Sequence, residues 1–524
     1  MRECRNKKIT FKPYEQEQLM MLDLGSMVPQ NHVVRQINSA IDSMDIEYLL
    51  IKYMPGGTST YNPRMMLKVL VFAYTQKIFS SRKIATSLKR DVYFMWLSGM
   101  NQPDFRTINA FRSNRMKDII EKVLAQVVSM LCEQGYINFE DYFVDGTKIE
   151  ANANKYTFVW KKSVEKYKAA LETNVKKLMK EIDDINDSEE IKYNGEDLPE
   201  NKPVSSEDIK KFSDELNKML DELPEHKEIK KAKQKVDNDF LPRMKKYEEQ
   251  LDIIGNDRNS YSKTDTDATL IRMKVYHMKN SQLKPGYNVQ IGTQNQFILN
   301  AEILQDRNDN AALKPMIDSL NNSTAHIPTN ICADSGYGNE ETYEFLEKNN
   351  INNYVKYTYF HKEQKKQYRE NKFLIGNFNY DEDNDEYICP ADKRLKFKYN
   401  SKRITENNFE QSIVNYECED CFSCDLKDKC TKSKGNRSIT VNKNLNRHKN
   451  IARINLTSEK GLSLRSRRPI EVEAAFGNIK WNMGFKRFTL RGLKKVKIEW
   501  VLLCIAHNFN KLTNMKNKMD ILPI

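Results

Sequence analysis

YFVDGTKI, residues 142–149, alternates apolar and polar side chains as a β-strand does and carries an aspartate, Asp145, near its centre. Two more strands are predicted at 287–292 (YNVQIG) and 297–303 (FILNAEI), joined by a short polar turn that suits a hairpin. A helix, the strand within NICADSGYG (330–338), a second helix and a last strand follow. This order of elements is typical of a mixed sheet covered by helices, so we predict an α/β fold.

The charge of the chain restricts the classes of partner. Its 524 residues include 85 Lys and Arg against 72 Asp and Glu, a formal net charge of +13. Such an excess of positive charge favours a polyanionic partner. No stretch approaches the ~18 apolar residues of a membrane span, and the nine cysteines are odd in number and mostly scattered, which fits a reducing compartment. We expect a soluble, cytoplasmic protein with no membrane partner.

Helical patterns fill the sequence before the first predicted strand, so we predict an all-α N-terminal domain over residues 1–135. Asn62-Pro63 opens one apolar helix, because proline suits the first helical turn. A later helix follows Asp104, a good N-cap. The side of this helix that we expect to face outward carries Arg106, Asn109 and Arg112. That side is either the DNA-reading face of a helix-turn-helix or the solvated face of a helical bundle.

Two insertions interrupt the α/β pattern. Residues 155–259 are rich in Lys and Glu and repeat apolar residues every three or four positions, which predicts a helical hairpin or a short antiparallel coiled coil. We interpret this segment as a spacer or contact arm. Residues 357–459 form the second insertion, which is polar and contains several cysteines. The rest of 136–356 plus 460–515 makes up the expected α/β domain.

The cysteines of the second insertion suggest a metal site. Close thiol pairs in a cytosolic chain favour a structural zinc ion, which takes four ligands. We predict the set Cys389, Cys421, Cys424 and Cys430, with Cys418 free, because a Cys-x2-Cys-x5-Cys core plus a distant thiol closes a ribbon-like knuckle. An iron–sulfur cluster and a metal-free loop are the alternatives.

Three acidic residues are candidates for catalysis. Asp145 and Asp334 each close a predicted strand, and neighbouring strands would bring both carboxylates to one edge of the sheet. Mg²⁺ prefers such ligands, although an aspartate at a strand end is also a common cap or turn former. Glu473 follows Pro469 on a predicted helix and shares a face with Lys480. A third acid would complete a two-metal site with the lysine beside a DNA phosphate, whereas the alternative is an exposed Glu and Lys on a solvated helix.

Several motifs together resemble a known family. VDGT (144–147), ADSGY (333–337) and EVEAAFGNIK (471–480) are similar to motifs of the DDE transposases of bacterial insertion sequences, as are KPGYNVQ (284–290) and RGLKKVK (491–497). The resemblance covers nearly the whole chain outside the helical arm. It implies a ribonuclease-H-like mixed sheet with insertions, preceded by a helical DNA-binding domain. The residues that it assigns to catalysis are the metal-binding Asp145, Asp334 and Glu473 together with Lys480.

The resemblance also implies an activity and partners. It implies a transposase that binds the terminal inverted repeats of its element and performs metal-dependent cleavage and strand transfer of double-stranded DNA. The implied cofactors are two Mg²⁺ ions, for which Mn²⁺ can substitute, and we expect a homodimer on DNA in a bacterial, nucleoid-associated location. The residues expected to contact DNA are Arg106, Asn109, Arg112, Arg468, Lys486, Arg487, Arg491, Lys494 and Lys495. The alternatives are another ribonuclease-H-like nuclease, such as a resolvase, and a catalytically silent, domesticated DNA-binding protein.

Overall fold

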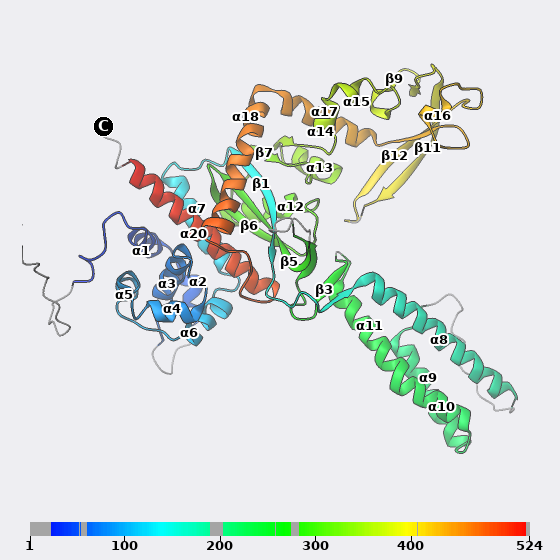
Figure 1. Ribbon diagram of the computed structural model, residues 1–524, viewed down its shortest axis with the longest axis horizontal. Coiled ribbons are helices and arrows are strands. Elements are labelled where there is room, and N and C mark those ends of the chain that lie inside the picture. Colours follow the sequence, from blue (N-terminus) through cyan, green and yellow to red (C-terminus); the bar gives the residue numbers. More distant parts are fainter. Residues whose placement is uncertain are drawn as a thin grey trace, which may run out of the picture.

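The computed structural model describes residues 23–51, 53, 60–188, 203–256, 258–273, 282–405 and 407–519 (Figure 1). Its first elements are helices: α1 (Val33–Ser43), α2 (Glu47–Leu50), α3 (Pro63–Thr75), α4 (Ser81–Ser87), α5 (Val92–Ser98), α6 (Phe105–Ala110), the π-turn η1 (Phe111–Arg115) and α7 (Ile120–Glu133). The predicted N-cap Asp104 is present, since its Oδ1 accepts a hydrogen bond from Thr107 N at 2.7 Å. A helix also begins at Pro63 as expected, where Asn62 Oδ1 accepts a hydrogen bond from Arg64 N at 2.8 Å.

A mixed six-stranded sheet forms the centre of the protein. Its strands are β1 (Asp141–Glu150), β4 (Thr269–Arg272), β5 (Leu283–Gln294), β6 (Phe297–Leu304), β7 (Asn330–Ala333) and β8 (Asn352–Val355). β5 lies antiparallel to β1 on one side and to β4 and β6 on the other. β7 lies parallel to β1 and to β8, which gives the order β4-β5-β1-β7-β8 with β6 beside β5. This α/β arrangement is consistent with the ribonuclease-H-like fold that we expected.

One hydrophobic core joins the N-terminal helices to the sheet. The elements that cover the sheet include α12 (Leu313–Thr324), α13 (Glu340–Lys348) and the long C-terminal helix α20 (Leu493–Met519). α20 packs against both α3 and β6, and a single core cluster runs from Val28 through Trp500 to Leu512. Because the first seven helices share this core, a separate all-α N-terminal domain is not confirmed.

The first insertion is a helical arm that projects away from the sheet (Figure 1). Its elements are α8 (Lys161–Ser188), α9 (Ser206–Glu222), α10 (Lys227–Lys235), the π-turn η2 (Val236–Phe240) and α11 (Leu241–Ile254). The arm has a hydrophobic cluster of its own, which includes Leu171, Leu216 and Phe240. A short antiparallel pair, β2 (Phe158–Trp160) and β3 (Ser260–Ser262), closes the base of the arm. The helices predicted from the apolar spacing are therefore present.

The second insertion contains a five-stranded antiparallel sheet that the sequence did not lead us to expect. Its strands, in the order β13-β12-β11-β10-β9, are β9 (Asn379–Asp381), β10 (Glu386–Ile388), β11 (Arg394–Ile404), β12 (Glu410–Cys418) and β13 (Ser438–Val441). The short helices α14 (Phe360–Glu363), α15 (Lys366–Arg369), η3 (Ile375–Asn377) and α16 (Lys427–Cys430) lie around it.

The chain then returns to the central sheet through α17 (Lys443–Thr457) and α18 (Glu459–Arg468). These helices pack on the face of the sheet that carries Phe143 and Cys332. α18 continues through a π-turn η4 (Pro469–Glu473), the short α19 (Ala474–Gly477) and a second π-turn η5 (Asn478–Asn482). In the described ranges no helix has both the length and the apolar character needed to cross a membrane.

Candidate active site

Asp145 and Asp334 lie on the adjacent inner strands of the central sheet, Asp334 directly after β7 and Asp145 within β1, which it does not close as we predicted. β1 and β7 run parallel with Phe143 opposite Cys332, so the residues two positions further along each strand are Asp145 and Asp334. The two carboxylates contact one guanidinium group, since Arg468 Nη2 lies 2.9 Å from Asp145 Oδ2 and 4.0 Å from Asp334 Oδ2. The structure thus brings together these two predicted residues with the arginine at the end of α18.

The surroundings of Asp145 disfavour its negative charge. Burial raises the pKa of the Asp145 carboxyl, Arg468 opposes the rise, and the nearby carboxylates Asp334 and Asp309 add to it. The Arg468 side chain is itself only 8% exposed, and its Nε has no hydrogen-bond partner among the described residues. Asp145, Asp334 and Arg468 therefore form a group of charges that is not fully compensated.

Glu473 lies in the π-turn that follows Arg468. We expected an α-helix in which Glu473 shares a face with Phe476 and Lys480, but two π-turns interrupt that helix, and Phe476 is buried while Glu473 is exposed. A π-turn brings residues five positions apart into neighbouring turns, as Arg468 and Glu473 are. Such turns are frequent at functional sites because they change the direction of a side chain without ending the helix.

Lys480, in the second π-turn, reaches the strand that carries Asp145. Its Nζ donates hydrogen bonds to the hydroxyl of Thr147 and to the carbonyl oxygen of Lys148, the latter at 3.2 Å. Burial lowers the pKa of Lys480 to about 8, the ammonium of Lys148 adds to this effect, and Asp145 opposes it. The ammonium therefore lies within electrostatic reach of Asp145.

The two aspartates are suitable ligands for a divalent cation. Mg²⁺ usually takes one or two carboxylates and completes its shell with water and substrate phosphate oxygens. The Asp334 side chain is 52% exposed, so the pair is open to solvent. The Asp334 carboxylate adds to the raised pKa of Asp145, and a bound cation relieves this repulsion. However, no three His, Cys, Asp or Glu side chains in the described ranges are arranged to hold a metal ion, so Glu473 does not complete the site here.

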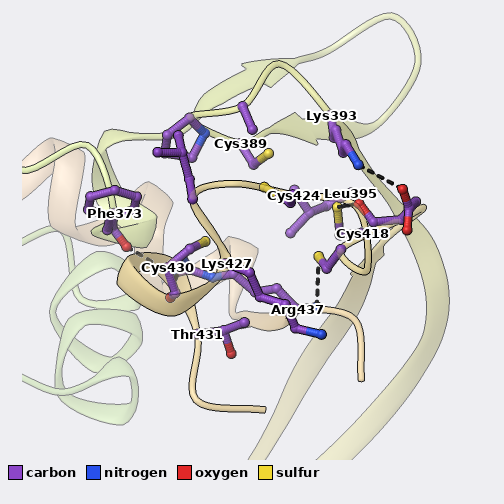
Figure 2. A pocket seen from close by; sticks show the side chains of 15 residues that line it. Phe373, Cys389, Lys393, Leu395, Cys418, Cys424, Lys427, Cys430, Thr431 and Arg437 are labelled. Carbon is purple, nitrogen blue, oxygen red and sulfur yellow. Dashed lines mark hydrogen bonds and ion pairs between the residues drawn. The ribbon is translucent and has the colours of Figure 1, made fainter. Parts of the chain in front are cut away.

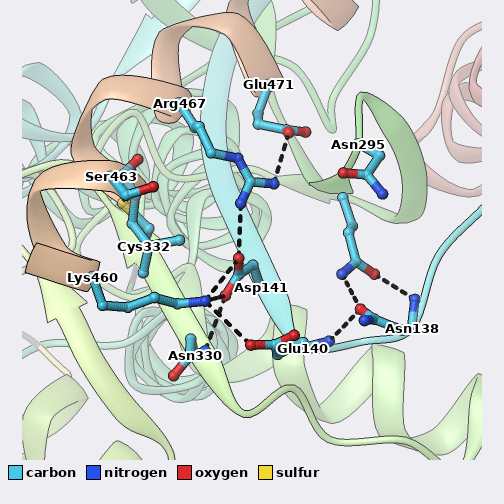
Figure 3. A network of polar contacts seen from close by, with 12 residues as sticks. Asn138, Glu140, Asp141, Asn295, Asn330, Cys332, Lys460, Ser463, Arg467 and Glu471 are labelled. Atoms are coloured by element: carbon cyan, nitrogen blue, oxygen red, sulfur yellow. Dashed lines mark hydrogen bonds and ion pairs between the residues drawn. The ribbon is translucent and has the colours of Figure 1, made fainter.

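An ionic network around the buried carboxylates of Asp141 and Glu471 holds the helix that carries Arg468 against the start of β1 (Figure 3). Arg467 Nη1 contacts Asp141 Oδ2 at 2.8 Å, and Lys460 Nζ contacts Asp141 Oδ1 at 3.0 Å. Arg467 Nη2 also lies 3.4 Å from Glu471 Oε1, while Glu471 Oε2 accepts a hydrogen bond from the backbone N–H of Gln296 at 2.6 Å. Glu471 thus serves the attachment of the helix, and Glu473, two residues on, is left at the surface.

Two segments of the chain match family models of transposase domains. Residues 388–513 match the model described as Transposase DDE domain, and residues 22–114 match the model described as Transposase domain (DUF772). These matches support a DDE insertion-sequence transposase. Comparisons with curated proteins and with solved structures found no match. The transposase DDE match begins in the second sheet and includes Arg468, Glu473 and Lys480, whereas Asp145 and Asp334 precede it.

The cationic residues that we predicted to contact DNA differ in their exposure. The five that follow Glu473 in sequence are all exposed: Lys486, Arg487, Arg491, Lys494 and Lys495. Two of these also support the local fold, since Arg487 donates to the carbonyl oxygens of Ala151 and Ala153, and Arg491 Nε donates to that of Asn152 at 2.7 Å. Arg468, in contrast, is buried against the aspartates.

The prediction that Arg112 faces outward is wrong. Arg106 and Asn109 are exposed, but Arg112 is 3% exposed. Its guanidinium donates hydrogen bonds to the Phe79 carbonyl oxygen at 2.7 Å, to Tyr74 Oη at 3.1 Å and to Asn109 Oδ1 at 3.2 Å. α6 ends at Ala110, and the π-turn that follows changes the helical phase, so Arg112 points into the protein.

The predicted zinc site is not supported. Five cysteines line one pocket beside the second sheet, namely Cys389, Cys418, Cys421, Cys424 and Cys430 (Figure 2). The guanidinium of Arg437 donates a hydrogen bond to Cys430 Sγ at 2.7 Å, so this thiol already has a cationic partner. Burial, with a contribution from neighbouring Cys421, raises the pKa of the Cys418 thiol, which we predicted to be free, to about 12. The predicted ligands are near one another but are not arranged as a metal site.

One acidic residue at the site was not predicted from the sequence. Asp309, in the connection between β6 and α12, lies 3.2 Å from Lys148 Nζ through its Oδ1 and affects the pKa of Asp145. It belongs to the polar stretch QDRNDN (305–310), which has the composition of an ordinary surface turn. The one signal in the sequence was its position between a predicted strand and a predicted helix.

Proposed function

We propose that this protein is a DNA transposase that cleaves double-stranded DNA at the terminal inverted repeats of its insertion sequence and joins the cut ends to target DNA. The observation that carries the proposal is the meeting of Asp145 and Asp334 at Arg468, on the adjacent parallel strands β1 and β7. The two transposase-domain matches support the same class of function.

In this proposal Asp145 and Asp334 hold Mg²⁺ or Mn²⁺, and Glu473 completes the ligand set when DNA is bound. When bound, two such ions would polarise the reacting phosphodiester and activate the attacking oxygen. The chain's own groups orient the substrate: Lys480 contacts a phosphate beside the acids, and Arg468 fixes the directions of both aspartates. No covalent protein intermediate is required, because catalysis consists of positioning and charge stabilisation.

The exposed cations after Glu473 would hold the DNA on the same side. Lys486, Arg487, Arg491, Lys494 and Lys495 are exposed and follow the acid-bearing helix in sequence. The Trp481 ring is 58% exposed, with Lys486 Nζ 4.4 Å from its centroid, so it is available to stack on a base. The neighbouring Phe485 and Phe488 are buried, and we assign them to the core. Two copies of the chain would be needed to bring two element ends together, so we propose a homodimer on DNA.

A joint cleavage and joining assay tests the proposal. Purified protein and Mg²⁺ are incubated with labelled DNA carrying the inverted repeats that flank the coding sequence, and with a branched DNA of the same length. We expect nicking at the repeat ends followed by joining to a second duplex. Cutting of the branched DNA without joining would instead identify a resolvase-like nuclease, and binding of the repeats without any cutting would identify a DNA-binding protein.

A further inference from the structure

Asp309 accepts three hydrogen bonds through a single carboxylate oxygen. Its Oδ1 lies 2.7 Å from Asn288 Nδ2, 2.9 Å from Gln290 Nε2 and 3.2 Å from Lys148 Nζ. Asn288 and Gln290 are fully buried on β5, and Lys148 lies opposite Asn288 on β1. A carboxylate with this number of donors is held in one place.

One of these donors, Gln290, also connects the segment that carries Asp145 with the segment that carries Asp334. Gln290 lies opposite Gly146, the residue after Asp145, and a Cβ atom at Gly146 would overlap the Gln290 carboxamide. Only glycine fits there, and Gln290 can therefore lie directly beside β1. The other end of the Gln290 side chain, Oε1, accepts a hydrogen bond from the buried hydroxyl of Tyr337, three residues after Asp334.

Lys148 lies next to the proposed catalytic groups. Lys480 Nζ donates to the Lys148 carbonyl oxygen, and the Lys148 ammonium contributes to the lowered pKa of Lys480. The Lys148 and Asp309 side chains are 17% and 28% exposed, so their ion pair is partly open to solvent. A DNA phosphate that reached the Lys480 ammonium would therefore also approach the ammonium group of Lys148 on β1.

We propose that Lys148 is a second cationic contact for the reacting phosphate and that Asp309 is the positioning residue that holds it. The inference rests on the proposed function, because it concerns the same DNA substrate. Asp309 acts through Lys148: the fixed carboxylate, itself held by Asn288 and Gln290, keeps the flexible lysine side chain extended beside Lys480. Less side-chain freedom is then lost when the phosphate binds.

The test measures DNA binding and cleavage in the full-length variants Asp309→Asn, Lys148→Ala and the double variant. The exposed pair Glu347 and Arg447, with atoms 2.6 Å apart, provides Glu347→Gln as a control that removes the same charge elsewhere. Binding of element-end DNA is followed without added metal over a range of salt concentrations, and kcat/KM for cleavage is measured with Mg²⁺. Thermal unfolding monitors the fold of each variant.

We expect Lys148→Ala to reduce the salt dependence of binding by about one phosphate contact. Asp309→Asn should weaken binding as well, although removal of a negative charge beside DNA would by itself strengthen it. Each single change should lower kcat/KM by roughly 10- to 100-fold, and the double variant should be no worse than the single ones, because Asp309 acts through Lys148.

The contrary results are distinct. Stronger DNA binding by Asp309→Asn would contradict the positioning role, and so would additive losses in the double variant. An unchanged salt dependence in Lys148→Ala would remove the phosphate contact. If the wild type binds element ends but does not cut them, the proposed function fails, whereas the binding arm still decides this inference.

Discussion

At the scale of single residues, two glutamates that are two positions apart have opposite surroundings. Glu471 is 5% exposed and contacts Arg467. It also accepts a hydrogen bond from the backbone N–H of Gln296, in the turn between β5 and β6. Glu473 is exposed and lies in the π-turn that follows Arg468. The first attaches the helix to the sheet, and the second is free of that task and is the one that we assign to the metal.

This difference predicts opposite effects for the two alanine variants. Glu471→Ala should lower the free energy of unfolding by about 2 kcal/mol, because it removes hydrogen bonds made by a buried charged group. Glu473→Ala should change stability by no more than about 0.5 kcal/mol but abolish DNA cleavage. Denaturant unfolding and the cleavage assay measure both effects. If Glu471→Ala were stable but inactive while Glu473→Ala remained active, Glu471 and not Glu473 would be the metal ligand.

At the scale of elements, the attachment of α20 to the edge strand β6 depends on a neutral histidine. His507 Nε2 lies 2.9 Å from the Gln296 carbonyl oxygen, and its Nδ1 lies 2.9 Å from Asn478 Nδ2, so one ring nitrogen donates and the other accepts. The next residue, Asn508, bonds both the N–H and the C=O of Ile298, each at 2.8 Å. α20 thereby covers hydrogen-bonding groups of a strand that would otherwise be an open edge.

The environment of His507 predicts a loss of stability at acid pH. Burial lowers its pKa from 6.5 to about 4, so the unfolded chain binds the proton more readily than the folded protein. The contribution of neutral His507 to the free energy of unfolding is complete above pH 6.5. As the pH falls from 6.5 toward 4, the free energy of unfolding decreases by roughly 3 kcal/mol. Denaturant unfolding at pH 7 and pH 4 should show a smaller loss in His507→Gln than in the wild type. Equal losses would show that His507 is not the group that titrates.

The helical arm is an element that the rest of the protein should not require. Trp160 and Ser260 pair at the end of the β2–β3 ladder, where the arm begins and ends. Replacement of residues 161–259 by Asn-Gly would join these strands through a two-residue hairpin turn. We expect the shortened protein to keep a cooperative thermal transition within a few degrees of the wild type, since the arm has its own core. Loss of the folded state would show that the arm supports the sheet.

At the scale of the whole molecule, the sequence predicted the central sheet better than the parts that surround it. The strand at Asp145 and the strand before Asp334 were recognisable because buried strands have a strong apolar signal. The second sheet was missed although the first half of β11 alternates polar and apolar residues, because the rest of the strand, from Asn400 to Arg403, is polar and the segment reads as a polar loop. Arg112 was misplaced because the π-turn η1 breaks the helical period, and Asp309 was missed because its loop resembles any polar turn.

The chain has a net charge of +13. Exposed cations gather in the sequence after Glu473, so we predict that the DNA-binding surface is concentrated there and not spread over the molecule. Lys494 and Lys495 are exposed at the start of α20, and Lys210 and Lys211 are equally exposed on the arm. Replacement of both lysines by alanine at the first position should reduce the salt dependence of DNA binding by about two contacts, whereas the arm variant should bind as the wild type does. If the two variants weakened DNA binding equally, the lysines would act only through long-range attraction of the DNA and not through contacts at one surface.

The central claim is that Asp145 and Asp334 form the catalytic centre of a DNA-cleaving enzyme, and the isosteric variants Asp145→Asn and Asp334→Asn test it most directly. Mg²⁺-dependent cleavage of element-end DNA is measured in the same preparations as end binding, with Asp318→Asn on the exposed side of α12 as the control. We predict that each variant at the site binds the ends but cleaves them at least about 100-fold more slowly. Cleavage at the wild-type rate by either variant would contradict the claim.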